Sequence, residues 1–344
     1  MIFRRVLLLI GMVCGVAQAT EPDSFRVRVA ILRGEPDFKT AFRKVCQHDY
    51  KDTIRIVKNA KGTYDAINIL DIEDLLLGVI GREMSPDSPR EALKAQAVAA
   101  RSHALYQAAA SANQTYDLVA NISQAYMGKA KLEKNIILAI ESTRGQVLYY
   151  KGKPIPAFFH SSCGGHTELA SSVWQRIPDP ATSKDLSLPG MVACPYCAQA
   201  SNQKWSFQIG TVQLAQLLKR DGQRIGSAPE VVVAEKAGGG HALTVGILTD
   251  AGEIRMPADK FRSLVGYSNL RSTLFEVSRP VLPDGTVQDG FIFQGGGSGH
   301  GVGLCQYGAC GMAKKKASYT DILAYYFPKS RIRTYDPPTL ASVR

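Results

Sequence analysis

Apolar and polar residues alternate in short bursts over residues 25–69. The stretches Phe25-Arg26-Val27-Arg28-Val29 and Thr53-Ile54-Arg55-Ile56-Val57 show this period of two most clearly. A period of two places successive side chains on opposite faces of an extended chain. The pattern therefore predicts an N-terminal sheet of half-buried strands.

Helical periods follow directly after this region. We expect a short helix that starts at Asp71, runs through Ile80 and ends at Gly81. Ser88, Pro89 and Glu91 then form the pattern of a capping box with proline at the first helical position. The helix that they open is expected to continue to about residue 110. Residue 83 would lie on the loop between the two helices.

The rest of the chain predicts further helices and strands. We expect a helix over residues 135–143 and a hairpin over 146–159 that turns at 151–153 and places His160 at a strand end. Residues 168–200 have the composition of a loop, and a last helix is expected to start at Thr320 and stop before Pro328.

These elements predict an α+β fold with two parts. A core with a mixed sheet and packed helices is expected over residues 20–200 and 286–335. A helix at 211–220, followed by strands near 230–233 and 243–248, predicts a smaller inserted α+β subdomain over residues 201–285.

The first nineteen residues have the pattern of a secretion signal. Arg4 and Arg5 precede an apolar run, and Ala17-Gln18-Ala19 is a small-x-small cleavage site, so the mature chain is expected to begin at Thr20. Cys14 would be removed with the signal. An uncleaved membrane anchor is the alternative. We expect an exported protein of the periplasm or cell envelope.

The chain is strongly basic. Its net charge is +11, and removal of a signal with two arginines and no acidic residue leaves 11 − 2 = +9. This excess suits a polyanionic partner. Because export separates the protein from nucleic acid, acidic cell-wall glycan or anionic lipid head groups are the expected partners. A basic surface that only serves solubility is the alternative.

Three separated segments resemble the SpoIID/LytB family of cell-wall proteins. They are Glu83-Met84-Ser85-Pro86 running into residues 92–101, then residues 159–168, then residues 299–309. The resemblance implies a lytic transglycosylase that cleaves peptidoglycan glycan strands from which the stem peptides have been removed. Members of the family have also been described as enhancers of amidases. A non-catalytic, glycan-binding enhancer of a cell-wall amidase is therefore the competing hypothesis.

The resemblance assigns the catalytic acid to Glu83, at the glutamate of the family's Gly-x-Glu-Met pattern. Arg82 departs from the small residue common there. A lytic transglycosylase needs one carboxyl group, because no water has to be activated, whereas glycoside hydrolases generally use two. Lys94 and Arg101, seven residues apart on one helix face, are candidate binding residues for acidic sugar groups.

His300 is the third candidate substrate residue. It lies in the glycine run of residues 295–303, and the resemblance places it at the glycan cleft. The run lacks the Gly-Lys-Ser/Thr ending of a phosphate loop, so a nucleotide site is excluded. A histidine that only makes a hydrogen bond under a tight loop is the alternative.

Cysteine and histidine pairs point to a structural zinc site. Cys163-x-x-His166 and Cys194-x-x-Cys197 provide three sulfurs and one imidazole, the closed tetrahedral shell of structural zinc. His160 is a possible substitute for one of the four. A zinc amidase or peptidase is disfavoured, because this shell leaves no open position for an activated water.

Disulfides are the alternative to zinc in an exported protein. A bond between Cys194 and Cys197, or between Cys163 and one of them, would fit the six cysteines that remain after removal of the signal. Cys305 and Cys310 are close enough in sequence to form another. A thiol-oxidoreductase site at Cys-Pro-Tyr-Cys is disfavoured, since no thioredoxin-like βαβ pattern surrounds it.

Overall fold

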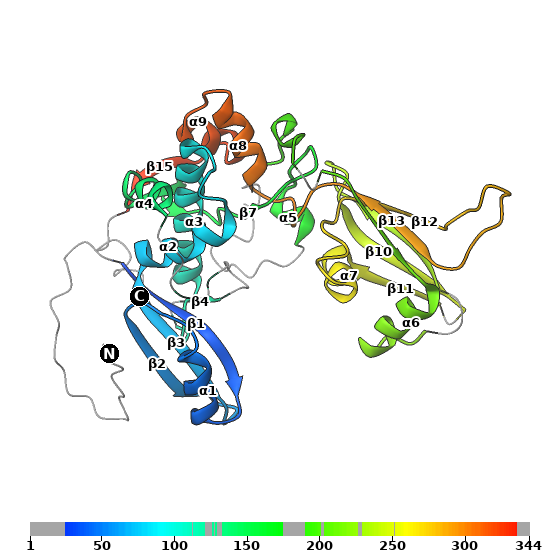
Figure 1. Cartoon of the computed structure of the whole chain (residues 1–344), viewed down its shortest axis with the longest axis horizontal. Helices are drawn as coiled ribbons and strands as arrows, with labels where there is room; N and C mark the ends of the chain where they lie inside the picture. Colours follow the sequence, from blue (N-terminus) through cyan, green and yellow to red (C-terminus); the bar gives the residue numbers. More distant parts are fainter. Residues whose placement is uncertain are drawn as a thin grey trace. The chain divides into compact units, whose positions relative to one another are not determined.

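The computed structural model describes residues 25–111, 113–120, 126, 128, 133–174, 190–200, 203–225, 229–250 and 252–335. The predicted signal over residues 1–19, with Cys14, lies outside the described residues. The chain divides into two compact units, unit 1 with residues up to 157 and from 329, and unit 2 with residues 158–328. The helices and small sheets of both units make this an α+β protein, which confirms the predicted fold class (Figure 1).

A mixed sheet forms the N-terminal part of unit 1. Its order is β2-β3-β1-β4, with β1 antiparallel to β3 and parallel to β4. The bounds are β1 (Arg26–Glu35), β2 (Thr53–Lys58), β3 (Tyr64–Asp71) and β4 (Leu118–Val119), and helix α1 (Phe38–Val45) connects β1 to β2. Val27 and Val29 of β1 are buried, and Arg26 and Arg28 are half-buried, as the alternating pattern predicts.

Three helices form the rest of the core of unit 1. They are α2 (Ile72–Glu83), α3 (Arg90–Ala110) and α4 (Lys134–Glu141). The alanine side chains of α3 are small, which allows α2 and α4 to pack closely against this helix (Figure 1). The predicted capping box is wrong, because Pro89 is the N-cap and no side chain caps the helix. The predicted end of α2 is also wrong, since the Met84 N–H still reaches the Ile80 carbonyl beyond Gly81.

A second, small sheet of unit 1 has the order β15-β5-β6. Its strands are β5 (Gln146–Tyr150), β6 (Lys153–Pro154) and β15 (Arg331–Thr334). The two-residue turn between β5 and β6 has positive φ at both positions, 49° at Lys151 and 79° at Gly152. This geometry matches the twist of the paired strands and confirms a turn at Lys151 and Gly152. The second strand of the predicted hairpin is wrong, because Lys153 already belongs to β6, residues 155–158 form no strand, and β7 (Phe159–His160) pairs with β14 (Leu304–Cys305).

Unit 2 contains a compact α+β region. Two three-stranded sheets, β11-β10-β9 and β12-β13-β8, enclose a common hydrophobic core with α6 and α7. The bounds are β8 (Trp205–Ile209), α6 (Thr211–Arg220), β9 (Glu230–Lys236), β10 (Ala242–Thr249), β11 (Gly252–Pro257), α7 (Ala258–Val265), β12 (Phe275–Ser278) and β13 (Phe291–Gly295). Phe261 and Phe293 are fully buried at its centre. The bounds of an inserted subdomain at residues 201–285 stay a prediction.

The rest of unit 2 is rich in loops. Strands β7 (Phe159–His160) and β14 (Leu304–Cys305) pair in parallel. Around them lie α5 (Ala170–Val173), the 3-10 turn η1 (Pro195–Cys197), α8 (Gln306–Lys314) and α9 (Tyr319–Tyr326). A capping box of Ser318 and Asp321 starts α9. No helix within the described ranges of either unit combines the length and apolar character needed to cross a bilayer.

Candidate functional site

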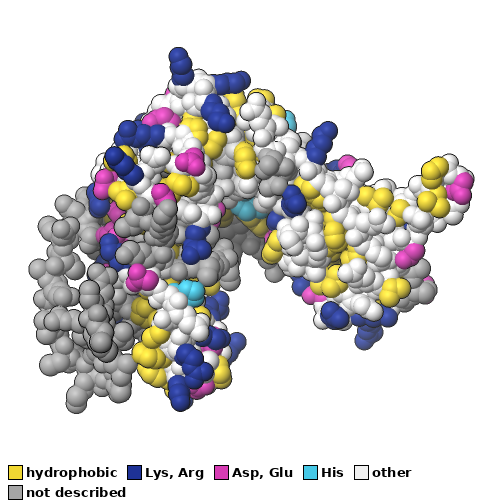
Figure 2. All heavy atoms as spheres, viewed as in Figure 1, with side chains coloured by type: hydrophobic (Ala, Val, Ile, Leu, Met, Phe, Trp, Pro, Cys, Tyr) yellow, Lys and Arg dark blue, Asp and Glu magenta, His cyan; other side chains and the backbone are white. Residues whose placement is uncertain are grey.

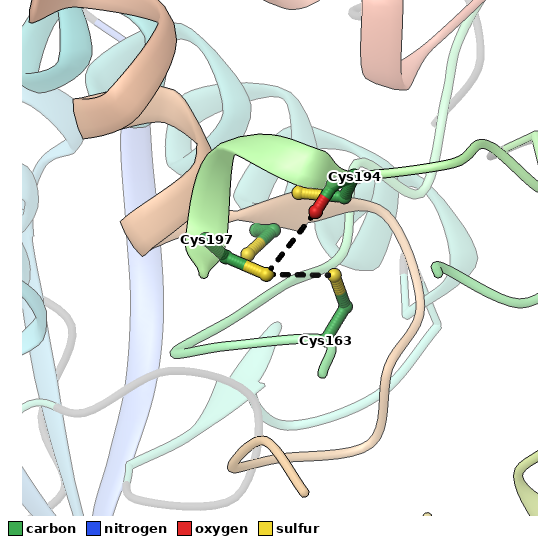
Figure 3. Close-up of side chains that lie close together, drawn as sticks. Cys163, Cys194 and Cys197 are labelled. Carbon is green, nitrogen blue, oxygen red and sulfur yellow. Dashed lines mark hydrogen bonds between the residues drawn. The ribbon is translucent and has the colours of Figure 1, made fainter. Parts of the chain in front are cut away.

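Four buried cysteines meet in unit 2. The sulfur atoms of Cys163, Cys194, Cys197 and Cys305 all lie within 4.8 Å of one another. The Sγ atoms of Cys163 and Cys197 are 3.6 Å apart, and Figure 3 shows the labelled side chains pointing toward one another. The structure therefore brings together three of the four residues proposed as metal ligands and adds Cys305.

The structure corrects the identity of the expected fourth ligand, His166. His166 is exposed and does not belong to the group, although its backbone forms a bridge with Ala193. Cys305 takes its place, because the parallel pairing of β14 with β7 brings Cys305 beside His160, three residues before Cys163. His160 itself is not in the group. Its Nδ1 lies 3.1 Å from the Val302 carbonyl, and burial lowers the pKa of His160 to about 4.

The disulfide alternatives are not formed. All six cysteines of the described residues are free thiols. The separation of 3.6 Å between the sulfurs of Cys163 and Cys197 far exceeds the roughly 2.05 Å of a disulfide bond. The pairing of Cys305 with Cys310 is wrong as well, because Cys305 faces the cluster and Cys310 lies outside it.

Hydrogen bonds from the surrounding chain hold the sulfurs in place. The Cys305 sulfur caps α8 and accepts a hydrogen bond of 3.3 Å from the Gly308 N–H. The Tyr326 hydroxyl lies 3.0 Å from the Cys194 sulfur. A Cβ atom at Gly308 would stand 2.6 Å from the same sulfur and would also overlap the Tyr326 hydroxyl, so only glycine fits there.

The four thiols differ in the direction of their pKa shifts. Hydrogen bonds with Cys163 lower the pKa of Cys197 and of Cys194. Hydrogen bonds with Cys194 and Cys197 raise the pKa of Cys163, and burial raises the pKa of Cys305. A tetrahedral shell with metal–sulfur bonds of about 2.3 Å has sulfur–sulfur edges of about 3.8 Å. The observed 3.6 Å edge, the buried thiols and the hydrogen bonds to the sulfurs fit a metal of the structural zinc type.

Glu83 lies in unit 1, at the end of α2. It is the last helical residue rather than a loop residue, which corrects the predicted position. Its side chain is half-buried, and the following Met84 is buried at 8% exposure, so the α2–α3 connection is anchored to the core directly after the carboxyl group. This arrangement gives Glu83 a defined position with access to solvent.

Lys94 and Arg101 lie on α3 in the same unit but have different surroundings. The Lys94 side chain is 17% exposed, and its ammonium pairs with Glu91 at 2.7 Å. Arg101 is 1% exposed and makes a bidentate pair with Glu73, with N–O distances of 2.9 and 2.6 Å. The assignment of Arg101 to substrate binding is therefore wrong. Its guanidinium fixes α3 to α2 and, through the Gln146 carbonyl, to β5.

His300 lies in unit 2, in a loop whose conformation requires glycine at positions 301 and 303. A Cβ at Gly303 would overlap the Phe158 carbonyl, and one at Gly301 would stand 2.5 Å from the His241 ring. The His300 Nδ1 accepts a hydrogen bond of 3.1 Å from the Val302 N–H. The imidazole is half-buried, so both the glycan-cleft assignment and the hydrogen-bonded alternative fit its geometry.

Two aromatic rings that were not among the predicted site residues lie beside His300. The His300 ring lies 4.9 Å from the Trp174 ring and 6.2 Å from the Phe158 ring, between ring centroids. Trp174 is half-buried, and Phe158 contacts it at 4.7 Å. Aromatic faces of this kind pack against the apolar faces of ligands. The sequence signal was Trp174, one of the two tryptophans, shortly after the His160 segment.

A buried polar contact joins three loops of unit 2. The Glu168 N–H donates to the Gly301 carbonyl at 2.8 Å, and the Glu168 carboxylate accepts from the His241 N–H at 3.3 Å. Burial raises the pKa of Glu168 and lowers the pKa of His241 to about 4. Glu168 and His241 therefore hold the His300 loop in place.

Two family models match separate parts of the chain. Residues 60–150 match the SpoIID family, described as stage II sporulation protein. The three candidate residues of unit 1 lie in this stretch. Residues 197–303 match a domain of unknown function, DUF8618.

Known proteins are similar over most of the chain. An uncharacterized protein of Brachyspira hyodysenteriae is 36% identical over 269 residues, which are 77% of this chain and 67% of that protein. The stage II sporulation protein D of Bacillus amyloliquefaciens is 27% identical over 318 residues, 87% of this chain and 86% of its own. The amidase enhancer of Bacillus subtilis is 25% identical over 76% of this chain, which spans 40% of that protein. With the motifs and the family model, these similarities establish that the chain belongs to the SpoIID/LytB family.

Proposed function

We propose that this protein is a lytic transglycosylase of the bacterial cell wall, acting on peptide-free peptidoglycan glycan strands. The observation that carries the proposal is the position of Glu83. It is a half-buried carboxyl group at the end of α2, followed by a buried anchor, inside the stretch that matches the SpoIID family. Glycoside cleavage needs a positioned proton donor of this kind.

One carboxyl group is sufficient for the proposed reaction. Glu83 donates its proton to the glycosidic oxygen as the C1–O bond breaks. The resulting carboxylate then removes the proton from the C6 hydroxyl of the same muramic acid residue, whose oxygen bonds to C1. The product is a 1,6-anhydro end, and Glu83 regains its proton. Because water takes no part, no second carboxylate is required.

Lys94 and His300 are proposed as binding residues of this reaction. Lys94 is a half-buried cation whose partner Glu91 leaves part of its side chain exposed, and acidic sugar groups attract such a cation. His300 stands beside Trp174, whose ring offers a face for a sugar. Arg101 is left out of the proposal, because its guanidinium is buried against Glu73.

A bound zinc ion is proposed as a structural element of unit 2. The four thiolates of Cys163, Cys194, Cys197 and Cys305 would close its shell. A closed shell leaves no position for substrate, so the metal would stabilise the loops around residues 163 and 194 without taking part in the reaction.

A second candidate function is the enhancement of an amidase without cleavage of the glycan. The relative named amidase enhancer favours it. A strongly basic chain of net charge +11 would suit glycan binding in either role. For both candidate functions we propose export to the periplasm or cell envelope. Peptidoglycan is the proposed partner, and a cell-wall amidase is the proposed second partner.

The substitution Glu83→Gln tests the catalytic proposal. The amide keeps the shape of the side chain but has no proton to donate, so release of anhydromuramyl products from peptide-free strands is expected to fall at least about a hundredfold. The products are measured by chromatography and mass spectrometry. Glu141→Gln makes the same change on the exposed face of α4 and serves as the matched control.

The outcome separates the two functions. Normal cleavage by the Glu83→Gln protein would overturn the assignment of the acid. If the wild-type protein binds strands without cleaving them, and raises the activity of an added cell-wall amidase, the enhancer function replaces the enzyme.

A further inference from the structure

Three lysines stand together at the end of α8. Lys314, Lys315 and Lys316 are consecutive and exposed. The Lys315 ammonium lies over the ring of Tyr196, 5.2 Å from its centroid, which gives this cation a preferred position. Lys316 has a φ of 68°, so the chain turns sharply there and α8 stops.

Two aromatic side chains, Tyr196 and Tyr325, lie on the Lys315 side of this group. The rings of Tyr196 and Tyr325 meet edge to face, with centroids 5.8 Å apart and an interplanar angle of 78°. Both side chains are half-exposed. The Tyr325 hydroxyl donates to the Ala193 carbonyl, which fixes the orientation of its ring. We call Lys314, Lys315, Lys316, Tyr196 and Tyr325 the basic ledge.

The charge of the basic ledge is not neutralised within the described part of unit 2. None of its lysines has a carboxylate within ion-pair distance there. The acidic residue nearest in sequence, Asp321, is engaged in the capping box with Ser318. Figure 2 shows Lys and Arg side chains projecting from the surface where α8 and α9 lie, beside side chains of the hydrophobic class, which includes tyrosine.

The basic ledge has a rigid base. Tyr196 lies between Cys194 and Cys197 of the cysteine cluster, so the cluster determines where its ring stands. A Cβ at Gly311 would overlap the Tyr196 carbonyl, which means that α8 and the η1 turn are in direct backbone contact. Lysines on an ordinary solvated helix have no such fixed aromatic neighbour.

We propose that the basic ledge is a second binding site, for acidic saccharide polymers. The tyrosine rings offer faces for sugar rings, and the three ammonium groups pair with carboxylates or phosphates along the polymer. The inference extends the proposed function, on whose substrate class it rests, to a strand-holding site built from residues other than those proposed for cleavage. The carboxylates of muramic acid and the phosphates of teichoic acid are the two sources of the required negative charge.

The test compares two triple variants, each made in the full-length Glu83→Gln protein so that strands stay intact. Lys314→Gln, Lys315→Gln and Lys316→Gln remove the charge of the basic ledge. Lys204→Gln, Lys219→Gln and Arg220→Gln remove the same charge from exposed positions elsewhere in unit 2. The probes are peptide-free glycan strands, poly(glycerol phosphate), and neutral N-acetylglucosamine oligomers. Affinities are measured by fluorescence anisotropy at two salt concentrations.

The ledge variant is expected to bind acidic polymers about tenfold more weakly, because three exposed ion pairs are lost together. The control variant should stay within about twofold of the parent, and replacing the lysines by arginine should retain binding. The probe that loses affinity identifies carboxylate or phosphate as the recognised group.

Equal losses in the two triple variants, or no loss in either, would overturn the proposal, since net charge alone or another site would then be responsible. Cleavage is measured separately on the wild-type protein. A protein that never cleaves, but whose ledge variant still binds weakly, would remove the transglycosylase and leave the basic ledge in place.

Discussion

Unit 1 and unit 2 position their functional residues in different ways. In unit 1, Glu83 ends a helix that apolar packing and one buried ion pair, between Arg101 and Glu73, hold against α3. In unit 2, a glycine-rich loop carries His300, and four buried cysteines from separate segments bring their sulfurs within 4.8 Å of one another. A catalytic acid needs only one rigid helix end, whereas long loops need crosslinks to stay ordered.

The two tryptophans allow this difference to be measured. Trp174 and Trp205 both lie in unit 2. Tryptophan fluorescence therefore follows the unfolding of unit 2, and amide hydrogen exchange of α3 follows unit 1. Three predictions use these two readouts.

The largest expected effect comes from the cysteine cluster. Cys197→Ser removes one of the four proposed zinc ligands, and a complete structural zinc site contributes about 10–16 kcal/mol. We expect unit 2 to lose more than about 5 kcal/mol and its cooperative fluorescence transition, while α3 keeps its exchange protection. Chelation should have the same effect on the wild-type protein. Cys46→Ser, an exposed cysteine of unit 1, is the control. Equal stability of both variants would contradict a structural metal.

The second prediction addresses the buried ion pair of unit 1. Arg101→Met leaves the Glu73 carboxylate buried without its partner, which is expected to lower the free energy of unfolding by about 3–5 kcal/mol. Exchange protection of α3 should fall while the fluorescence transition of unit 2 stays in place. The double variant with Glu73→Leu should be more stable than Arg101→Met alone. If it is less stable, the hydrogen bond that Glu73 accepts from the Gly145 N–H contributes more than the unpaired charge costs.

The smallest effect is a pH dependence of unit 2. Burial lowers the pKa of His241 from 6.5 to about 4, so the folded protein favours the neutral imidazole. Stability from this site is present above pH 6.5 and decreases as the pH falls toward 4, by about 1.4 kcal/mol per pH unit for one proton. Replacement by asparagine removes this proton.

The measurement is denaturant unfolding followed by fluorescence at pH 4.5, 5.5 and 6.5. The His241→Asn protein should bind about one proton fewer on unfolding than the wild type. Because the pKa of the neighbouring Glu168 is raised, its titration acts in the opposite direction, and only the difference between the two proteins is interpreted. His48→Asn, an exposed histidine of unit 1, should leave the pH dependence unchanged. An identical slope for all three proteins would show that His241 is not held neutral.

Local patterns in the sequence determined most elements, and the family resemblance assigned the catalytic candidate Glu83. The predicted helix from residue 89 to about 110 corresponds to α3 (Arg90–Ala110), and the turn at Lys151 and Gly152 is where it was expected. Hydrophobic period and turn chemistry depend on neighbouring residues, so they can be read from the chain itself. The same reasoning identified three of the four clustered cysteines.

The tertiary structure decided what depends on distant neighbours. Cys305 replaces His166 because β14 pairs with β7, two strands that are more than 140 residues apart in sequence, and no local spacing announces that contact. Arg101 has the spacing of a surface cation, yet its burial follows from the packing of α2 on α3 and from Glu73, 28 residues earlier. Helix periodicity shows which side chains share a face. Only the folded chain shows what that face meets, because burial and charge pairing are set by the elements packed against it.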